Sequence, residues 1–245
     1  MVTKSKDYSS IKTVNQEIFD KHADNYSKTI DESLASYGAT HDFFMDHKAR
    51  LIKSLLKTKR LKTENMHLLD VGCGIGKIHA RLGTSFASIL GVDVSHESIA
   101  KAKLDFPEHT YLVYDGQRLP VETASLDMTL AICVFHHVPP NEWQNLASEM
   151  MRALRPGGVA FVIEHNPWNP VTRRIVNKCP IDRDAVLLTR RTTRTLFKNA
   201  GAKKIFARTI ISIPPKTNFL MTIDNLLGIL PFGAQYFCVS LKETD

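Results

Sequence analysis

Apolar residues along this chain follow two alternating patterns, short continuous runs and helical spacing. Five of the continuous runs read HLLDVG, ILGVDVS, TYLVYD, LDMTLAICVFHHV and GGVAFVIEH. Runs of this kind are typical of strands buried on both faces, as in a parallel sheet covered by helices. Segments with helical spacing begin near Ile75, Glu97 and Asn141, between these runs. The alternation therefore predicts an α/β fold with a mostly parallel sheet.

Both ends of the chain add elements to this pattern. Helical spacing over residues 15–34 and from Thr40 to Lys57 predicts two helices. We expect residues 1–60 to form a helical cap on a main domain of residues 61–245. Near the C-terminus a helix ends just before Gly201, the residue type expected after a helix, and IFARTIISI and QYFCVSLK predict two more strands.

Two segments interrupt the alternation. Residues 166–190 are rich in Pro, Asn and Arg and are too long for an ordinary loop, so we interpret them as an ordered insertion that serves as a substrate lid. The segment FLMTIDNLLGIL, residues 219–230, is apolar on more than one face. It predicts a helix that belongs to the core, forms part of a lid, or makes a peripheral membrane contact beside basic residues.

Composition sets wider bounds. The chain has 245 residues, of which 43% are hydrophobic and 23% charged, as in a globular domain with a core. A net charge of +7 is compatible with an anionic substrate, nucleic acid, an anionic membrane or merely a basic surface. The four cysteines are scattered and form no C-x-x-C pair, which predicts free thiols and no metal site. The polar N-terminus and the absence of an apolar run near the ~20 residues of a membrane span predict a cytoplasmic protein.

The stretch HLLDVGCGIGKIHARL, residues 67–82, combines a strand, three glycines and a helical pattern. A helix beginning near Ile75 would present free backbone N–H groups to a ligand. The G-x-G-x-G spacing of Gly72, Gly74 and Gly76 differs from the G-x-G-x-x-G of dinucleotide-binding folds. Asp70 precedes the turn, where a carboxylate would repel a pyrophosphate but suit an ammonium group. These features argue against a nucleotide-dependent oxidoreductase.

Two further carboxylates follow the next strands. Asp93 ends ILGVDVS about 20 residues after the glycines, where an acid accepts hydrogen bonds from ribose hydroxyls. Asp115 ends TYLVYD, where it can accept a hydrogen bond from an adenine amino group. Each acid alone can be a turn or helix-cap residue. Three of them at one edge of a sheet predict a pocket for a nucleoside that carries an ammonium group.

The motifs LDVGCGIGK, GVDVS, YDGQRLP, LDMTLAICVFHHV and MRALRPGGVAFVIEH occur in this order and resemble those of class I S-adenosylmethionine-dependent methyltransferases. The resemblance covers about Asp20 to His165 and is greatest with the small-molecule branch of ubiquinone and menaquinone biosynthesis. HNPWNP, CPIDRDAVLL and PFGAQY further resemble an uncharacterised bacterial subgroup associated with surface-glycan or lipid pathways. The resemblance implies a Rossmann-like sheet of seven mostly parallel strands with helices on both faces. It also implies methyl transfer from S-adenosylmethionine, with S-adenosylhomocysteine as product.

The resemblance also implies a cofactor site. Asp70 and the glycine turn would hold the methionine moiety, Asp93 the ribose, and Asp115 the region of the adenine. An N-terminal tyrosine resembles one that closes over the cofactor carboxylate, although a core role is the alternative for it. The residues of this predicted site are Tyr26, Asp70, Gly72, Cys73, Gly74, Asp93, Val94, Asp115, Gly116 and Cys133.

Histidines after the fourth and fifth strands are candidates for proton transfer. His137 and His165 are the predicted general bases, because the pKa of a histidine lies near neutrality. Glu164 can serve instead, or it can pair with an arginine.

Substrate contacts are assigned to His136, Trp168 and Arg173, although the tryptophan can equally anchor the insertion. Seven basic residues crowd positions 173–194 and suit a phosphate or carboxylate. We therefore expect an anionic acceptor, either a small molecule or a lipid-linked sugar.

Two alternatives to this function remain. A nucleic-acid methyltransferase fits the charge, but CVFHH stands where enzymes that methylate base amino groups carry an aromatic residue after two prolines. A catalytically inactive binding module is the other alternative, and the three strand-end acids argue against it. The methyl acceptor, the attacked atom and the oligomeric state are left open.

Overall fold

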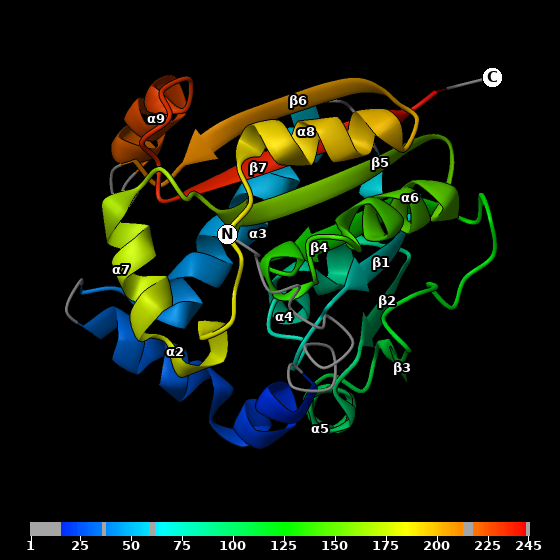
Figure 1. Ribbon diagram of the computed structural model, residues 1–245. Coiled ribbons are helices and arrows are strands. Elements are labelled where there is room, and N and C mark those ends of the chain that lie inside the picture. Colours follow the sequence, from blue (N-terminus) through cyan, green and yellow to red (C-terminus); the bar gives the residue numbers. More distant parts are fainter. Residues whose placement is uncertain (1–15, 36–37, 59–61, 213–217, 244–245) are drawn as a thin grey trace, which may run out of the picture.

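The computed structural model describes residues 16–35, 38–58, 62–212 and 218–243. These residues contain a seven-stranded sheet with the order β3-β2-β1-β4-β5-β7-β6 (Figure 1). Strands β1 to β5 pair in parallel, and β7 runs antiparallel to both β5 and β6. The strands are β1 (His67–Val71), β2 (Ser88–Asp93), β3 (Thr110–Val113), β4 (Leu126–Ile132), β5 (Leu154–His165), β6 (Ala202–Ile210) and β7 (Gln235–Lys242). The predicted mostly parallel α/β fold is confirmed, while the polar N-terminus, on which part of the cytoplasmic prediction rests, lies outside the described residues.

The central strands are buried on both faces, as their continuous apolar runs predict. Successive side chains of a strand point to opposite faces, so Leu68 packs on one side of the sheet and Leu69 on the other. The first side packs against α3 (His41–Thr58) and the second against α6 (Trp143–Ala153) and α8 (Arg190–Asn199). Figure 1 shows these helices on the two faces of the sheet.

The glycine turn after β1 differs from the prediction. The expected helix from Ile75 is absent, and the helix that follows, α4 (His79–Leu82), has four residues. Gly72, Gly74 and Gly76 all have positive φ, between +52° and +73°. Since φ in an α-helix is negative, helical conformation can begin only after the third glycine. The turn therefore offers backbone N–H groups of a loop, and not those of a long helix.

The N-terminal region consists of helical residues 16–22, η1 (Ala23–Asn25), α2 (Tyr26–Leu34) and α3. Helix α2 packs against α3 and against α7 (Pro170–Lys178), which lies in the predicted insertion. The Asn169 side chain caps α7 by accepting a hydrogen bond from Thr172 N at 2.9 Å. After α7 comes η6 (Pro180–Asp182). Residues 166–190 are thus an ordered segment beside the N-terminal helices, as Figure 1 also shows.

The C-terminal region contains α9 (Asn218–Leu227) between β6 and β7. The buried Asp224 fixes it, because its carboxylate accepts hydrogen bonds from Ile211 N at 2.9 Å and Ser212 N at 2.6 Å. Leu226 is 70% exposed, and Ile229 and Leu230 beyond the helix are also exposed. Among the helices of the described residues, none has the length and apolar character to cross a membrane.

Candidate active site

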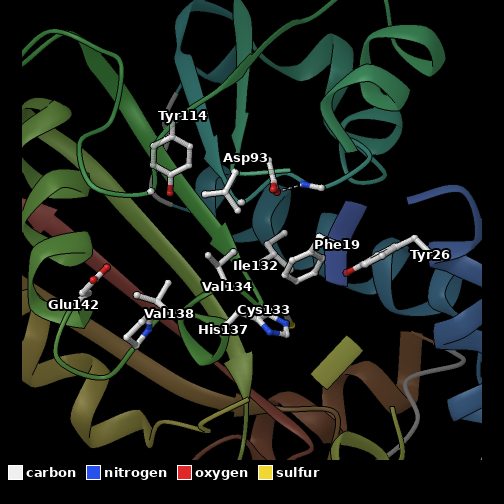
Figure 2. Close-up of a pocket in the computed structure, with 15 residues that line it drawn as sticks. Phe19, Tyr26, Asp93, Tyr114, Ile132, Cys133, Val134, His137, Val138 and Glu142 are labelled. Atoms are coloured by element: carbon white, nitrogen blue, oxygen red, sulfur yellow. Dashed lines mark hydrogen bonds between the residues drawn. The ribbon is translucent and has the colours of Figure 1, made fainter. Parts of the chain in front are cut away.

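Two adjoining pockets lie at the carboxyl ends of β1, β2 and β4. The first pocket has a cavity volume of about 100 Å³ and the second about 130 Å³. They share the wall residues Tyr26, Ile132, Cys133 and His137. In Figure 2 Asp93 and Tyr114 lie toward one side of the first pocket, and Cys133 and His137 lie on the opposite side. The first pocket is lined by Phe19, Tyr26, Gly72, Gly74, Asp93, Val94, Tyr114, Gly116, Ile132, Cys133, Val134, His137, Val138, Pro139 and Glu142.

Two glycines of the turn serve the first pocket in different ways. A Cβ on Gly72 would lie 2.6 Å from Cγ2 of Val134, so this glycine allows close packing between the turn and the chain after β4. A Cβ on Gly74 would meet no atom within 4 Å, although its φ of +52° favours glycine. The backbone at Gly74 is therefore open to the pocket, and a ligand can approach it closely.

Asp93 is the polar centre of the first pocket. One carboxylate oxygen accepts a hydrogen bond from Gly74 N at 2.8 Å, and the other accepts one from Ser95 N at 3.0 Å. Burial raises the pKa of Asp93, and these backbone donors oppose that rise. Each oxygen keeps a second acceptor site, so the side chain can accept hydrogen bonds from a diol.

Asp115 lies two residues after β3 but does not line the first pocket. Its side chain is exposed and accepts hydrogen bonds from Gln117 N at 2.8 Å and Arg118 N at 3.1 Å. The turn thus uses the carboxylate, and Tyr114 and Gly116 line the pocket on either side of it. The predicted contact of Asp115 with an adenine is not supported by this placement.

Asp70 is buried behind the glycine turn, where it lines a smaller pocket with Gly72, Cys73 and Gly74. Its Oδ2 lies 2.9 Å from Nε2 of His79, whose Nδ1 lies 2.8 Å from the hydroxyl of Tyr111. A hydroxyl that donates to Nδ1 leaves the Nε2–H to donate to Asp70. This chain of hydrogen bonds fixes the orientation of the Asp70 carboxylate.

The second pocket has apolar walls and a polar floor. Residues of α2, α3 and α7 form the walls, among them Ile30, Leu34, Phe44, Met45 and Ile175. The floor contains Lys48, Cys133, His136, His137, His165, Asp182 and Gln235. An acceptor in this pocket would contact both apolar side chains and several groups able to bind or move a proton.

Glu164 organises part of the floor. Its Oε1 accepts hydrogen bonds from Val134 N and Phe135 N at 2.8 and 2.7 Å, and its Oε2 lies 2.6 Å from Nδ1 of His136. Burial acts to raise the pKa of Glu164, but the adjacent His136 holds it below the ordinary value. Glu164 therefore pairs with a histidine, and the predicted pairing with an arginine is wrong. Glu164 is fully buried and is not among the lining residues of the second pocket, so it orients His136 from behind.

Cys133 stands between the two pockets with φ +57°, a strained value for a residue other than glycine. Lys48 Nζ donates to its Sγ at 3.5 Å, and Gln235 Nε2 donates at 3.6 Å. Burial acts to raise the pKa of the thiol, but the ammonium of Lys48 and the nearby His165 lower it to about 7. Lys48 itself is only 3% exposed. The shared wall therefore carries a thiol that ionises near neutrality.

One of the three predicted substrate contacts lines a pocket, and the other two do not. His136 lines the second pocket, but Trp168 is 68% exposed and Arg173 is exposed, and neither lines the two pockets. No arginine is among the residues described as lining either pocket. The cation that does reach the second pocket is Lys48, which sequence reasoning missed.

The comparisons with known proteins agree with this geometry. Residues 69–162 match the model of the family described as a methyltransferase domain. An uncharacterised methyltransferase of Synechocystis sp. is 30% identical over 103 residues, which are 42% of this chain and 49% of that protein. The N-terminal Xaa-Pro-Lys N-methyltransferase 1 of Xenopus tropicalis is 28% identical over 188 residues, 74% of this chain and 81% of its own length. This chain spans about half or less of the first curated relatives that it matches.

Among solved structures, a methyltransferase of Thermotoga maritima described as a possible histamine N-methyltransferase has the same fold. Its TM-score is 0.67 at 16% identity, and the match covers 93% of this chain and 99% of that one. The matched methyltransferase domain includes the glycine turn, Asp93 and Cys133, and the likeness to the solved structure shows a shared fold.

Proposed function

We propose that the protein binds S-adenosylmethionine in the first pocket and transfers its methyl group to a small acceptor in the second. The observation that carries this proposal is the wall shared by the two pockets, Tyr26, Ile132, Cys133 and His137. A donor in the first pocket and an acceptor in the second would both contact these residues and would meet at the end of β4. In-line displacement needs this kind of alignment more than it needs acid catalysis.

The residues of the first pocket fit the cofactor. Asp93 has acceptor capacity for ribose hydroxyls and Gly74 leaves its backbone open, while Asp70 is a buried carboxylate in the smaller pocket beside the same turn. Val94 and Tyr114 offer apolar surface for a base. When bound, S-adenosylmethionine supplies a methyl group on a positively charged sulfur. The chain would hold the donor, exclude water and receive the proton that the acceptor loses.

We assign the general base to His165, the predicted base that forms no ion pair with a carboxylate among the described residues of the second pocket. Its ring lies 3.5 Å from Gln235 and belongs to the same floor as Cys133 and Lys48. His137, the other predicted base, has its Nε2 3.3 Å from Asp182, which leaves it less available for an acceptor proton. The two N-terminal helices and residues 166–190 would act as cap and lid, since both contribute to the walls of the second pocket.

A lipid-linked acceptor is favoured by one surface feature. An exposed apolar surface contains Trp168, Leu226, Ile229, Leu230 and Phe232. Asn166 and Asn169 tie these segments together by donating to the carbonyls of Pro231 and Phe232 at 2.6 and 2.7 Å. Exposed arginines of α7 lie next in sequence and would favour anionic lipid. A peripheral membrane contact would bring the second pocket to its acceptor.

The test is transfer of label from methyl-labelled S-adenosylmethionine in a cell extract, followed by separation of small molecules, lipids and macromolecules. We expect label in the small-molecule or lipid fraction, and none there with the Asp93→Ala variant. Label in protein or nucleic acid would contradict the acceptor class. Binding of the cofactor without transfer to any fraction would favour an inactive binding module. A ubiquinone-like or glycan-pathway acceptor remains a prediction that the product's identity would decide.

A further inference from the structure

Three metal-ligating side chains converge on the floor of the second pocket. His136 and His137 end η5 (Phe135–His137), and Asp182 ends η6. Oδ1 of Asp182 lies 3.6 Å from Nε2 of His136 and 3.3 Å from Nε2 of His137. The ligand atoms of the three residues all lie within 4.8 Å of one another, and all three side chains line the pocket. The cluster joins two segments that are far apart in the sequence.

The orientation of His136 is fixed from behind. Its Nδ1 is held at 2.6 Å by Glu164, which two backbone N–H groups in turn hold in place. Nε2 of His136 is thereby directed to Asp182 and the pocket. Histidines that bind metal ions commonly use one ring nitrogen for the ion and give the other N–H to a carboxylate, which fixes the ring and increases its basicity. Glu164 and His136 have this arrangement.

The separations suit a shared ion better than direct hydrogen bonds. An N–H···O hydrogen bond usually spans about 2.7–3.2 Å, and both distances to Asp182 are longer. Two ligands placed about 2.1 Å from one tetrahedral ion lie about 3.4 Å apart. The site also brings the buried carboxylate of Glu164 and the largely buried carboxylate of Asp182 next to two imidazoles. A divalent cation would compensate these negative charges in a place that water reaches poorly.

We propose that His136, His137 and Asp182 bind a divalent first-row transition metal such as Zn²⁺, with Glu164 as the residue that positions His136. Two imidazoles and one carboxylate favour such an ion over Mg²⁺ or Ca²⁺, which prefer oxygen ligands. Three protein ligands leave coordination positions open. These positions face the second pocket, where the ion would take an oxygen or nitrogen of the methyl acceptor, a role that rests on the proposed function. The prediction of no metal site, drawn from the cysteines, is replaced by this proposal.

The test is calorimetric titration of the chelator-treated full chain with Zn²⁺, supported by the absorption spectrum of the Co²⁺ form. We expect one saturable site that Mg²⁺ does not occupy, and a Co²⁺ spectrum without the intense near-ultraviolet band of a thiolate ligand. Asp182→Asn should weaken Zn²⁺ binding at least 100-fold, and Glu164→Gln about 10- to 100-fold. The matched control is His41→Gln, which changes a histidine on the apolar wall of the same pocket and should leave binding unchanged.

Titration with S-adenosylmethionine separates this proposal from the proposed function. Asp182 does not line the first pocket, so Asp182→Asn should keep cofactor affinity, which also shows that the variant is folded. Absence of Zn²⁺ binding, or equal binding by the wild type and Asp182→Asn, would overturn the metal site. His136 would then be an imidazolium between two carboxylates. Zn²⁺ binding without cofactor binding would leave the metal site standing and contradict the proposed function.

Discussion

The first and second pockets share four lining residues, but most of their other lining residues come from different elements of the fold. The first is lined mainly by the segments that follow β1, β2, β3 and β4, with Asp93 as its polar centre. The second is made of side chains from α2, α3, α7 and the segments around them, with a charged floor under apolar walls. Both open toward Cys133, at the end of β4.

This difference separates two tasks. A pocket formed where strands end depends on the conformation of the sheet, so its ligand is fixed together with the fold. A pocket of side chains from helices that cap the sheet can change its ligand through substitutions that leave the sheet intact. We therefore expect general cofactor recognition in the first pocket and acceptor specificity in the second.

The largest effect on cofactor binding is expected for Asp93→Ala. The substitution removes a carboxylate that can accept hydrogen bonds from a diol, and hydrogen bonds to charged groups contribute roughly 1.5–3 kcal/mol each. We expect S-adenosylmethionine to bind about 100-fold more weakly in a calorimetric titration.

Asp115→Ala is the matched control for Asp93→Ala. Its exposed carboxylate accepts from the turn backbone at Gln117 and Arg118, so cofactor affinity should change less than about threefold. Equal losses in the two variants would show that the first pocket extends to Asp115, against the structure.

The next effect concerns the ionisation of the Cys133 thiol, which lines both pockets. The pKa of Cys133, about 7, lies below the ordinary thiol value because of Lys48 and His165, so the thiolate forms as pH rises through 7. Lys48→Met removes the ammonium that opposes the effect of burial on the thiol. The pKa of Cys133 should therefore rise by more than about one unit, a tenfold change in ionisation. Thiolate absorbance measured against pH, with Cys133→Ser as blank, gives this value. An unchanged midpoint would contradict the contact between the ammonium and the thiol.

Gly72→Ala and Gly74→Ala should affect different properties, the first mainly stability and the second mainly cofactor affinity. Both positions have positive φ, but only at Gly72 does a Cβ meet a neighbour, Val134 at 2.6 Å. We expect Gly72→Ala to lower the free energy of unfolding by about 3 kcal/mol and Gly74→Ala by about 1 kcal/mol. Gly74→Ala should instead weaken cofactor binding about tenfold, because its methyl enters the open space. Denaturant unfolding and calorimetry measure the two effects, and the reverse ranking of stabilities would contradict the packing at Val134.

The smallest effect is expected at the exposed apolar surface. Phe232→Glu should reduce binding to vesicles of anionic lipid about threefold, because it places a carboxylate on an apolar surface next to the basic helix α7. Leu104→Glu is the control, since Leu104 is 79% exposed on α5 (His96–Asp105), which Figure 1 shows away from α7 and α9. Cosedimentation measures both, and equal binding by the two variants would contradict a membrane contact at this surface.

The sheet and most of the first pocket were predictable from sequence because their signals are local. Continuous apolar runs mark strands buried on both faces, and a glycine turn or an acid directly after a run marks the carboxyl edge. Seven of the ten residues predicted for the cofactor line the first pocket. Of the three exceptions, Asp70 and Cys73 line the smaller pocket. Asp115 has a different reason, since an aspartate two residues before a backbone N–H readily closes a turn.

The second pocket was less predictable because its contacts are not local. Lys48 and Cys133 are separated by 85 positions, and His136 and Asp182 come from segments that meet only in the folded chain. From the sequence alone, Lys48 is expected at a solvent-exposed position of a helix, yet it is buried in the fold. His79 was missed for a similar reason, because its pairing with Asp70 requires the glycine turn to bring α4 back to β1. A buried charge or histidine is recognised only once its partner is in place.

The central claim is that the first pocket holds S-adenosylmethionine. Its most direct test is calorimetric titration of the full chain with S-adenosylmethionine, S-adenosylhomocysteine and NAD in parallel. The structure predicts one site per chain with affinity in the range of about 1–100 μM for the first two and no binding of NAD. Binding of NAD alone, or affinity for S-adenosylmethionine that Asp93→Ala leaves unchanged, would contradict it.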